Sequence, residues 1–163
     1  MKLRPTILAA ASLAAALLVV PMPEARAQAQ PPRATLKVRE IQASGKPDAE
    51  ARAAAIDERL ADLAAQLRRW PYARFELVGE PHVRSVAFGE EMAVDLSGGL
   101  VLTAVAREGD AGAVALEVKI RDADGAAVVT TGLHLRDGRT CLIGRELETA
   151  NGVLFLALTV QRE

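Results

Sequence analysis

Apolar and polar residues alternate along most of the chain beyond residue 73. In the clearest run, VALEVKIR at 114–121, an apolar residue occupies every second position. This period of two is typical of a β-strand with one buried face, because successive side chains point to opposite faces of a sheet. Turn sequences such as DADG at 122–125 separate the runs, which is typical of antiparallel strands. The pattern predicts strands near 36–43, 73–79, 82–88, 91–97, 100–107, 113–121, 126–135, 140–146 and 153–161.

The last predicted strand differs from the others because VLFLALTV, at 153–160, is apolar on both faces except at Thr159. Such a strand needs cover on both sides. Either a second sheet packs opposite a helix, or the sheet closes into a barrel around the strand. In the first predicted strand the apolar positions change phase between Val38 and Ile41, which indicates a possible β-bulge.

A different period precedes these strands. Between Asp48 and Trp70, large apolar residues follow one another at steps of four, three, four and three, which predicts one amphipathic helix. Asp48 is the expected N-cap, and Pro71 is expected to end the helix because it cannot donate an amide hydrogen bond. The apolar stripe should dock on a sheet and consists of Ile56, Leu60, Leu63, Leu67 and Trp70.

Together these patterns predict an α+β protein. It should consist mainly of an antiparallel β-sandwich of about eight or nine strands, with one N-terminal amphipathic helix. Residues 34–163 should form a single domain, preceded by a flexible lead at 28–33. A closed barrel remains the alternative to the sandwich.

The first 27 residues have the features of a secretory signal peptide. A basic start is followed by an apolar run at 7–20 and by small residues around Ala27, with a second cleavage frame two residues later. The apolar run is shorter than the roughly 20 residues that span a bilayer as a helix. We therefore expect an exported protein, periplasmic or secreted, with no transmembrane segment after signal removal.

Composition limits the chemistry of the mature chain. Removal of residues 1–27 leaves 17 basic and 20 acidic residues, a formal charge of −3, which disfavours nucleic acid as a partner. The two histidines, His82 and His134, are far apart in sequence, the chain has no paired Cys/His spacing typical of a metal site, and no glycine-rich phosphate loop precedes a helix. We expect neither a metal nor another cofactor.

One candidate binding patch is RRWPYARF at 68–75, which concentrates aromatic and arginine residues. These residue types dominate binding hot spots on protein surfaces. The alternative, which we favour, is that the aromatic rings pack under the end of the helix while the arginines neutralise its terminal carbonyls. The candidate partner-binding residues are Arg68, Arg69, Trp70, Tyr72 and Arg74.

A second candidate is the only thiol, Cys141, seven residues after His134 in a predicted hairpin at 133–147. A two-residue loop, DG at 137–138, would place His134 opposite Cys141, as a Cys/His catalytic pair requires. A three-residue loop would instead place the thiol in the core beside the leucines that flank His134, and this register is the one we favour. An intermolecular disulfide is a third interpretation of Cys141.

From ASGK at 43–46, through the helix and the glycine-centred hairpin, to LIG and then NG before an apolar last strand, the chain resembles a class of uncharacterised exported bacterial proteins of α+β type. The resemblance implies no known activity or site. The leading hypothesis is a non-catalytic interaction or assembly module of the cell envelope, with another envelope or exported protein as its partner. The alternatives are a β-barrel-like carrier of a small apolar ligand and a hydrolase that uses Cys141 and His134.

Overall fold

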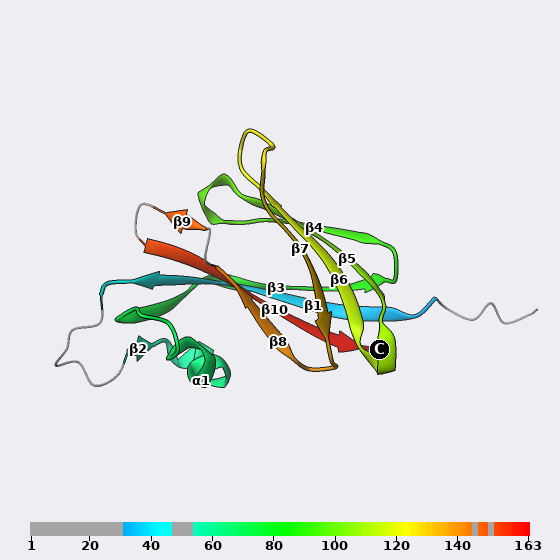
Figure 1. Cartoon of the computed structure of the whole chain (residues 1–163), viewed down its shortest axis with the longest axis horizontal. Coiled ribbons are helices and arrows are strands. Elements are labelled where there is room, and N and C mark those ends of the chain that lie inside the picture. Colours follow the sequence, from blue (N-terminus) through cyan, green and yellow to red (C-terminus); the bar gives the residue numbers. More distant parts are fainter. Residues whose placement is uncertain (1–30, 47–53, 145–146, 150–151) are drawn as a thin grey trace, which may run out of the picture.

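The chain folds into two mainly antiparallel β-sheets with a short helical segment (Figure 1). The computed structural model describes residues 31–46, 54–144, 147–149 and 152–163. The predicted signal peptide therefore lies outside the described residues. The six-stranded sheet contains β1 (Arg33–Ser44), β2 (Ala55–Ile56), β3 (Arg74–Ala87), β8 (Thr140–Ile143), β9 (Glu148–Thr149) and β10 (Gly152–Arg162). The four-stranded sheet contains β4 (Glu91–Asp95), β5 (Val101–Glu108), β6 (Val114–Arg121) and β7 (Ala127–Leu135).

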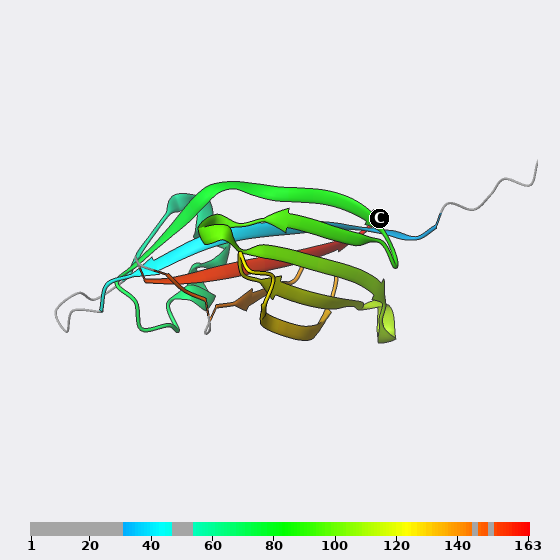
Figure 2. The same cartoon turned by 90° about the horizontal axis from the view of Figure 1, so that it is seen from above.

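The order of the strands determines which edges of the two sheets lie on the same side of the molecule. The six-stranded sheet runs β2-β3-β1-β10-β8, with β9 paired to β10, and the four-stranded sheet runs β4-β5-β6-β7. The chain passes from one sheet to the other after β3 and returns after β7. As a result β3 and β4 lie along one side of the molecule, and β7 and β8 lie along the other (Figure 2).

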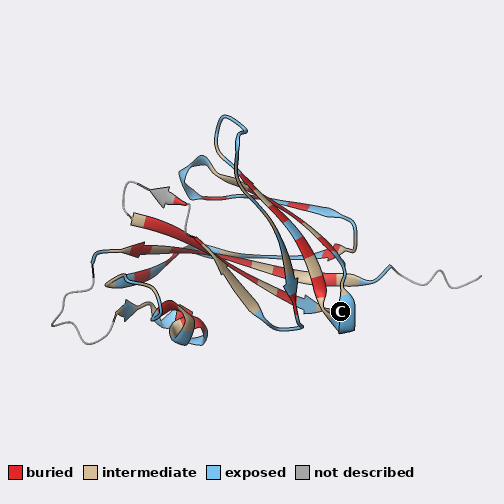
Figure 3. Cartoon of the chain, viewed as in Figure 1, coloured by how far each residue is buried: buried red, intermediate tan, exposed pale blue. Residues whose placement is uncertain are grey.

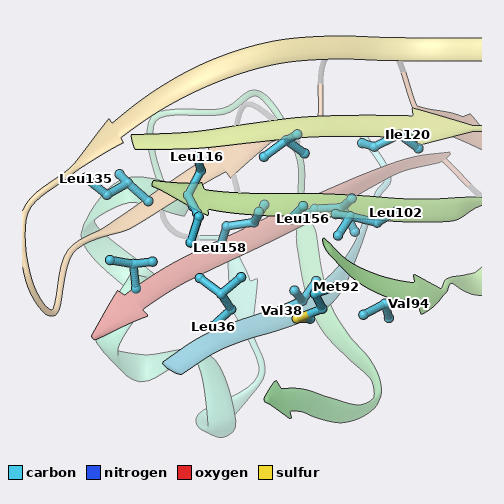
Figure 4. Close-up of a cluster of buried hydrophobic side chains, with 14 of the residues drawn as sticks. Leu36, Val38, Met92, Val94, Leu102, Leu116, Ile120, Leu135, Leu156 and Leu158 are labelled. Atoms are coloured by element: carbon cyan, nitrogen blue, oxygen red, sulfur yellow. The ribbon is translucent and has the colours of Figure 1, made fainter. Parts of the chain in front are cut away.

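The two sheets pack face to face around a common hydrophobic core (Figure 4). Both sheets contribute buried side chains, among them Leu36 and Leu156 from one and Leu102 and Leu116 from the other. These residues lie at alternating positions of their strands, which confirms the period-two interpretation. The architecture is mostly β and consists of two sheets, in agreement with the predicted class.

Strand β10 is buried on both faces (Figure 3), as its sequence predicts. Leu154, Leu156 and Leu158 belong to the core between the sheets, whereas Phe155 and Ala157 belong to a second core beneath the helical segment. Of the two alternatives for covering this strand, the structure has a second sheet opposite a helical layer. The helical layer is much shorter than predicted.

The prediction of one helix over 48–70 is wrong for the described part of that range. A 3-10 helix, η1 (Glu58–Leu63), leads into a single α-helical turn, α1 (Ala64–Leu67). The residues before η1 form β2, which pairs in parallel with β3. Residues 47–53, including the predicted N-cap Asp48, lie outside the described residues.

The pairing of β2 with the edge of β3 overrides the helical pattern. The backbone amide of Ala55 donates to the carbonyl of Ala73, just before β3, at 2.8 Å, and that of Asp57 donates to the carbonyl of Phe75 in β3 at 2.9 Å. Asp57 then serves as the N-cap, because its carboxylate accepts from the amide of Arg59 at 2.9 Å. Hydrogen bonds from Arg59 lower the pKa of Asp57 below its ordinary value. The predicted apolar stripe survives in shortened form, since Leu60, Leu63 and Leu67 are buried.

Two predicted strands, 73–79 and 82–88, are joined in the single strand β3. The irregularity lies at residues 79–81, because β3 advances by four residues between Val78 and His82 while β1 advances by two, between Glu40 and Val38. Gly79 has φ 63°, a left-handed value that favours glycine. The extra residues of the bulge are therefore in β3, whereas β1 keeps an unbroken register with β10.

The change of apolar phase in β1 marks a change of cover. Leu36 and Val38 face the four-stranded sheet, whereas Ile41 and Ala43 face the helical segment. The two covers are thus offset along the strand, and both side chains that are buried at the changeover, Arg39 and Glu40, are charged. Arg39 donates from both Nη atoms to the two carboxylate oxygens of Asp62 in η1, each at 2.8 Å. This ion pair fastens the helical segment to the sheet.

The other described helical turns are short links. Two links between predicted strands contain the 3-10 turns η2 (Ser97–Gly99) and η3 (Asp110–Gly112). On the inner face of β1, the buried carboxylate of Glu40 accepts from the amide of Ser97 at 2.8 Å, which anchors η2 to the six-stranded sheet. No helix among the described residues is long and apolar enough to cross a membrane.

The Arg39–Asp62 pair should stabilise the fold measurably. The Arg39 side chain is only 4% exposed, and Asp62 is the one acidic group that pairs with it among the described residues. The Arg39 Nε has no hydrogen-bond partner there, so the guanidinium depends on the two bonds to Asp62. We expect Asp62→Asn to lower the free energy of unfolding at neutral pH by about 1–3 kcal/mol, because a buried guanidinium loses its counter-charge. Chemical denaturation measures this change. Asp95→Asn, at an exposed aspartate of β4, is the control and should change stability by less than about 0.5 kcal/mol.

The same variants should differ in their response to acid. The Arg39 guanidinium lowers the pKa of Asp62 in the folded chain, so the pair contributes its full stability above the ordinary pKa of aspartate, about 3.9. This contribution is lost as the pH falls toward the lowered folded-state pKa. The stability gap between the parent protein and Asp62→Asn should therefore narrow below about pH 4. A gap that stays constant from pH 7 to pH 2 would contradict the role of this ion pair.

Candidate functional site

Two stretches that are far apart in sequence form an open cleft beside β8. One wall comes from the helical segment and the other from the turn before β8 and from β8 itself. The cleft has a volume of about 890 Å³. Its lining comprises Asp62, Leu63, Gln66, Arg69 and Trp70 on one side and Leu135, Gly138, Arg139, Thr140, Cys141 and Leu142 on the other. We call it the arginine cleft, after Arg69 and Arg139.

Trp70 is placed at this cleft by the end of the helical segment. Its amide donates to the carbonyl of Leu67 at 3.0 Å, and Pro71 follows. The half-buried indole meets the ring of Phe155 edge to face, with centroids 4.9 Å apart. A ring with one edge in the core and another toward the cleft is fixed in position and still available for contact.

The other aromatic residues of the predicted patch pack against the same core residue, Phe155, as Trp70 does. The ring of Tyr72 lies 6.1 Å from that of Phe75 and 5.9 Å from that of Phe155, both in edge-to-face geometry. Gly144, at the end of β8, is so close to the Phe155 ring that a Cβ atom there would collide with it. The aromatic cluster therefore packs as the favoured core interpretation predicts, while Trp70 alone also borders the cleft.

The arginines of the predicted patch separate in the structure. Arg69 is exposed on the rim of the arginine cleft, whereas Arg74 lines a different cleft of about 340 Å³ beside β2 and pairs with Glu76 at 3.5 Å. Arg68 is exposed at the end of α1. Of the five predicted partner-binding residues, the arginine cleft thus brings together Arg69 and Trp70.

The electrostatic character of the arginine cleft is positive. Arg69 and Arg139 are both exposed, and neither forms an ion pair with a described residue. The acidic residue of the lining, Asp62, is already bound by Arg39 through two hydrogen bonds. A ligand in the cleft therefore meets two guanidinium groups that have no acidic partner among the described residues, together with apolar lining residues such as Leu142.

The predicted hairpin at 133–147 is wrong in its pairing. Strand β7 pairs with β6 and strand β8 with β10, so the chain crosses from one sheet to the other at this turn. The turn itself has two central residues, because the amide of Arg139 donates to the carbonyl of Arg136 at 3.0 Å and Gly138 has φ 69°. Hydrogen bonds to β10 hold the turn: the Gly138 amide donates to the Val160 carbonyl at 2.8 Å.

The strands diverge for a physical reason. A positive φ at the third turn residue alone is the mark of a type II turn, whose twist splays strands, whereas hairpins favour types I′ and II′. The carboxylate of Asp137 accepts from the amide of Arg162 at 2.8 Å, which ties the turn to the end of β10. Neither of the two predicted hairpin registers therefore applies.

Cys141 and His134 lie on different sheets. The half-buried thiol packs against the core between the sheets together with Leu133 and Ile143. His134 alternates with Leu133 and Leu135 in β7, is exposed, and so faces away from that core. Burial raises the pKa of the Cys141 thiol, which favours its unreactive protonated form. The structure does not assemble the pair that a Cys/His hydrolase needs.

A second, smaller cleft lies on the other side of β8. It has a volume of about 430 Å³, and none of the described residues that line it is charged. Most of the lining side chains are apolar, including Val129 and Leu133 of β7 and Ile143 of β8, and Thr130 and Thr131 are the polar ones. We call it the apolar cleft. Trp70, Cys141 and Leu142 border both clefts, so the outer edge of β8 lies between them.

Sequence reasoning missed several residues of these clefts. Asp62 and Gln66, four residues apart, lie on the polar face of the predicted helix, which the pattern assigns to solvent rather than to a site. Arg69, three residues further along, is among the predicted partner-binding residues. The positions of Arg139 and Thr140 at the cleft cannot be predicted from the sequence, because the local pattern indicates a hairpin that would pair them with β7. Among the described residues, no three His, Cys, Asp or Glu side chains gather as a metal site would require.

The buried thiol should react slowly. We expect Cys141 in the folded chain to react with a thiol reagent at neutral pH at least about tenfold more slowly than in denaturant, because burial limits both access and ionisation. A cysteine introduced at an exposed turn, Ala123→Cys in a Cys141→Ala background, is the control and should react rapidly. Equal rates for the two folded proteins would show that Cys141 is a reactive surface thiol.

Comparison with known proteins adds no relative. No protein-family model, curated protein or solved structure matches the chain. What the chain does is therefore inferred from the geometry of its own clefts.

Proposed function

We propose that this chain is a non-catalytic interaction module of the bacterial cell envelope, exported by its N-terminal signal peptide, and that it binds a partner protein at the arginine cleft. The observation that carries the proposal is the convergence of Trp70, Arg69 and Arg139 on one open cleft. Tryptophan and arginine are the residue types that most often carry binding energy at protein interfaces.

The packing around Trp70 supports this role. The edge-to-face contact with Phe155 fixes the indole before a partner arrives, so little side-chain entropy is lost on binding. Leu63 and Leu142 provide apolar surface beside it. Binding energy would come mainly from this aromatic centre, with the polar rim excluding water around it.

The charges indicate the chemistry of the partner. Because Arg69 and Arg139 lack acidic partners among the described residues and Asp62 is neutralised by Arg39, an acidic surface would find complementary charge at the cleft. Complementary charge raises the association rate and excludes basic partners. An exported or envelope protein with acidic side chains in an accessible segment fits this requirement.

The proposal is preferred to the two alternatives for specific reasons. A carrier of the predicted kind needs an interior cavity in a closed barrel, but the space between the sheets contains packed side chains such as Leu102, Leu116 and Leu156. A Cys/His hydrolase needs a paired histidine, but His134 faces away from the core that contains Cys141. Both observations support a binding role.

Site-specific photocrosslinking in the envelope of the native host tests the proposal. A benzophenone amino acid at Gln66, in the arginine cleft, should form a discrete protein adduct, whereas the same group at Glu117, on the exposed face of β6, should not. Reversal of the rim charges by Arg69→Glu with Arg139→Glu should reduce the Gln66 adduct at least about fivefold, because the acidic partner is repelled.

The matched control reverses two exposed arginines outside the arginine cleft, Arg84→Glu with Arg121→Glu, and should leave the Gln66 adduct unchanged. An adduct that forms equally at Gln66 and Glu117 would contradict the proposal. So would an adduct at Gln66 that responds equally to both pairs of charge reversals.

A further inference from the structure

We infer that the partner is bound as an added β-strand: an extended segment, with acidic and apolar side chains at alternate positions, pairs with the outer edge of β8. This inference rests on the proposed function and specifies how the partner is held. It follows from three features of β8, which are its unpaired edge, the two clefts that border it, and the charge around it.

The first feature is the unpaired edge. Among the described strands, β8 pairs with β10 alone, through Thr140–Thr159, Cys141–Leu158, Leu142–Ala157 and Ile143–Leu156. Residues of an antiparallel strand alternate between those that bond to the neighbour and those whose backbone groups point away from it. The alternation therefore needs only one fixed point to assign every residue of β8.

Two contacts fix that point. The amide of Val160 donates to the carbonyl of Arg139 at 3.5 Å, so the pair before Thr140–Thr159 faces inward. The hydroxyls of Thr140 and Thr159 are 2.6 Å apart, as close side chains in a non-hydrogen-bonded pair can be. It follows that the N–H and C=O groups of Thr140 and Leu142 point away from β10, toward the outer edge.

The second feature is the different chemistry on the two sides of this edge. An added strand directs alternate side chains to opposite faces of the extended sheet. One set would enter the arginine cleft beside Arg69 and Arg139, and the other would enter the apolar cleft beside Val129 and Ile143. The pair of clefts thus selects acidic and apolar side chains in alternation, while the backbone groups of β8 supply the hydrogen bonds.

The third feature is the charge, which argues against a second copy of the chain as the occupant. Antiparallel pairing of two β8 edges would gather four guanidinium groups, those of Arg69 and Arg139 from each copy, around a paired segment only four residues long. The acidic residue of the cleft, Asp62, is already bound by Arg39, so self-pairing adds positive charge without the complementary charge that an acidic segment supplies. An edge bordered by arginines is thereby protected from self-pairing and left available to an acidic segment.

A synthetic peptide tests strand addition directly. The probe is a labelled peptide of alternating Glu and Val residues, and its binding to the mature chain is followed by fluorescence anisotropy. N-methylation of one alternate set of residues should weaken binding at least about tenfold because it removes the N–H groups that face β8, whereas N-methylation of the other set should have little effect. A peptide of alternating Lys and Val should bind at least about tenfold more weakly than the Glu peptide.

A variant of β8 tests the same interaction from the protein side. Thr140→Pro removes an N–H that points outward and no backbone hydrogen bond to β10, so an edge strand should tolerate it. It also removes the hydroxyl that lies 2.6 Å from that of Thr159, a loss that the Thr140→Val control reproduces. It should abolish binding of the Glu peptide. Thr140→Val, which loses the hydroxyl but keeps the N–H, should bind within about twofold of the parent protein. Melting temperatures establish that both variants are folded.

The outcomes separate this inference from the proposed function. Equal binding of both N-methylated peptides, or no binding of the Glu peptide at millimolar concentration, overturns strand addition. If the envelope adduct at Gln66 persists in that case, the interaction module stands and only its binding mode is wrong. A dimer of the mature chain that dissociates in Thr140→Pro would identify a second copy as the occupant and would also overturn the inference.

Discussion

Strand β10 lies between two hydrophobic layers, and the need to cover both of its faces determines where the other elements lie. Its inner residues, such as Leu156, pack against the four-stranded sheet, and Phe155 packs beneath the helical segment. Burial of each large apolar side chain contributes about 1.5–3 kcal/mol. A single sheet with one solvated face would leave one of these two sets of side chains exposed, so burial of both sets requires a layer on each side.

The three layers are offset, and the offset creates the candidate site. The helical segment covers only the part of the six-stranded sheet beside Ile41 and Phe155, where the Arg39–Asp62 pair fastens it. On the other face, the four-stranded sheet ends at β7, and β7 does not pair with β8. The edge of β8 is consequently left between two partial covers. A fold with fully aligned layers would have buried this edge.

The sequence predicts strands that bury one face, because their apolar residues alternate. It predicts the wrong element where pairing with a distant strand overrides the local preference for a helix. VALEVKIR at 114–121 predicts β6 because one face of that strand is buried and the other is more exposed, so apolar and polar residues alternate. The helical spacing that begins at Ile56 predicts the buried leucines correctly but not the pairing of β2, because the free edge of β3 is invisible in a local pattern. The phase change in β1 is visible, but its cause is the offset of two distant covers.

The same limit applies to the candidate site. The types of Trp70 and Arg69 indicate binding before any geometry is known, and the core role of the aromatic cluster is also predictable. Their meeting with Arg139 and Thr140 is not, because it depends on the crossing from β7 to β8 between sheets. The crossing is fixed by hydrogen bonds between the turn and β10, from the Gly138 amide to β10 and from β10 to the Asp137 carboxylate. Long-range hydrogen bonds of this kind produce no periodic pattern in the sequence.

Among the described strands, β8 has one edge paired with β10 and one free edge, and the proposed binding mode depends on that free edge. Residue-resolved amide hydrogen exchange of the mature protein, without any partner, tests it most directly. The amides of Thr140 and Leu142 should exchange at least about tenfold faster than those of Cys141 and Ile143, because only the latter pair donates to β10. Equal protection of all four amides would mean that the outer edge is already covered and would contradict the account.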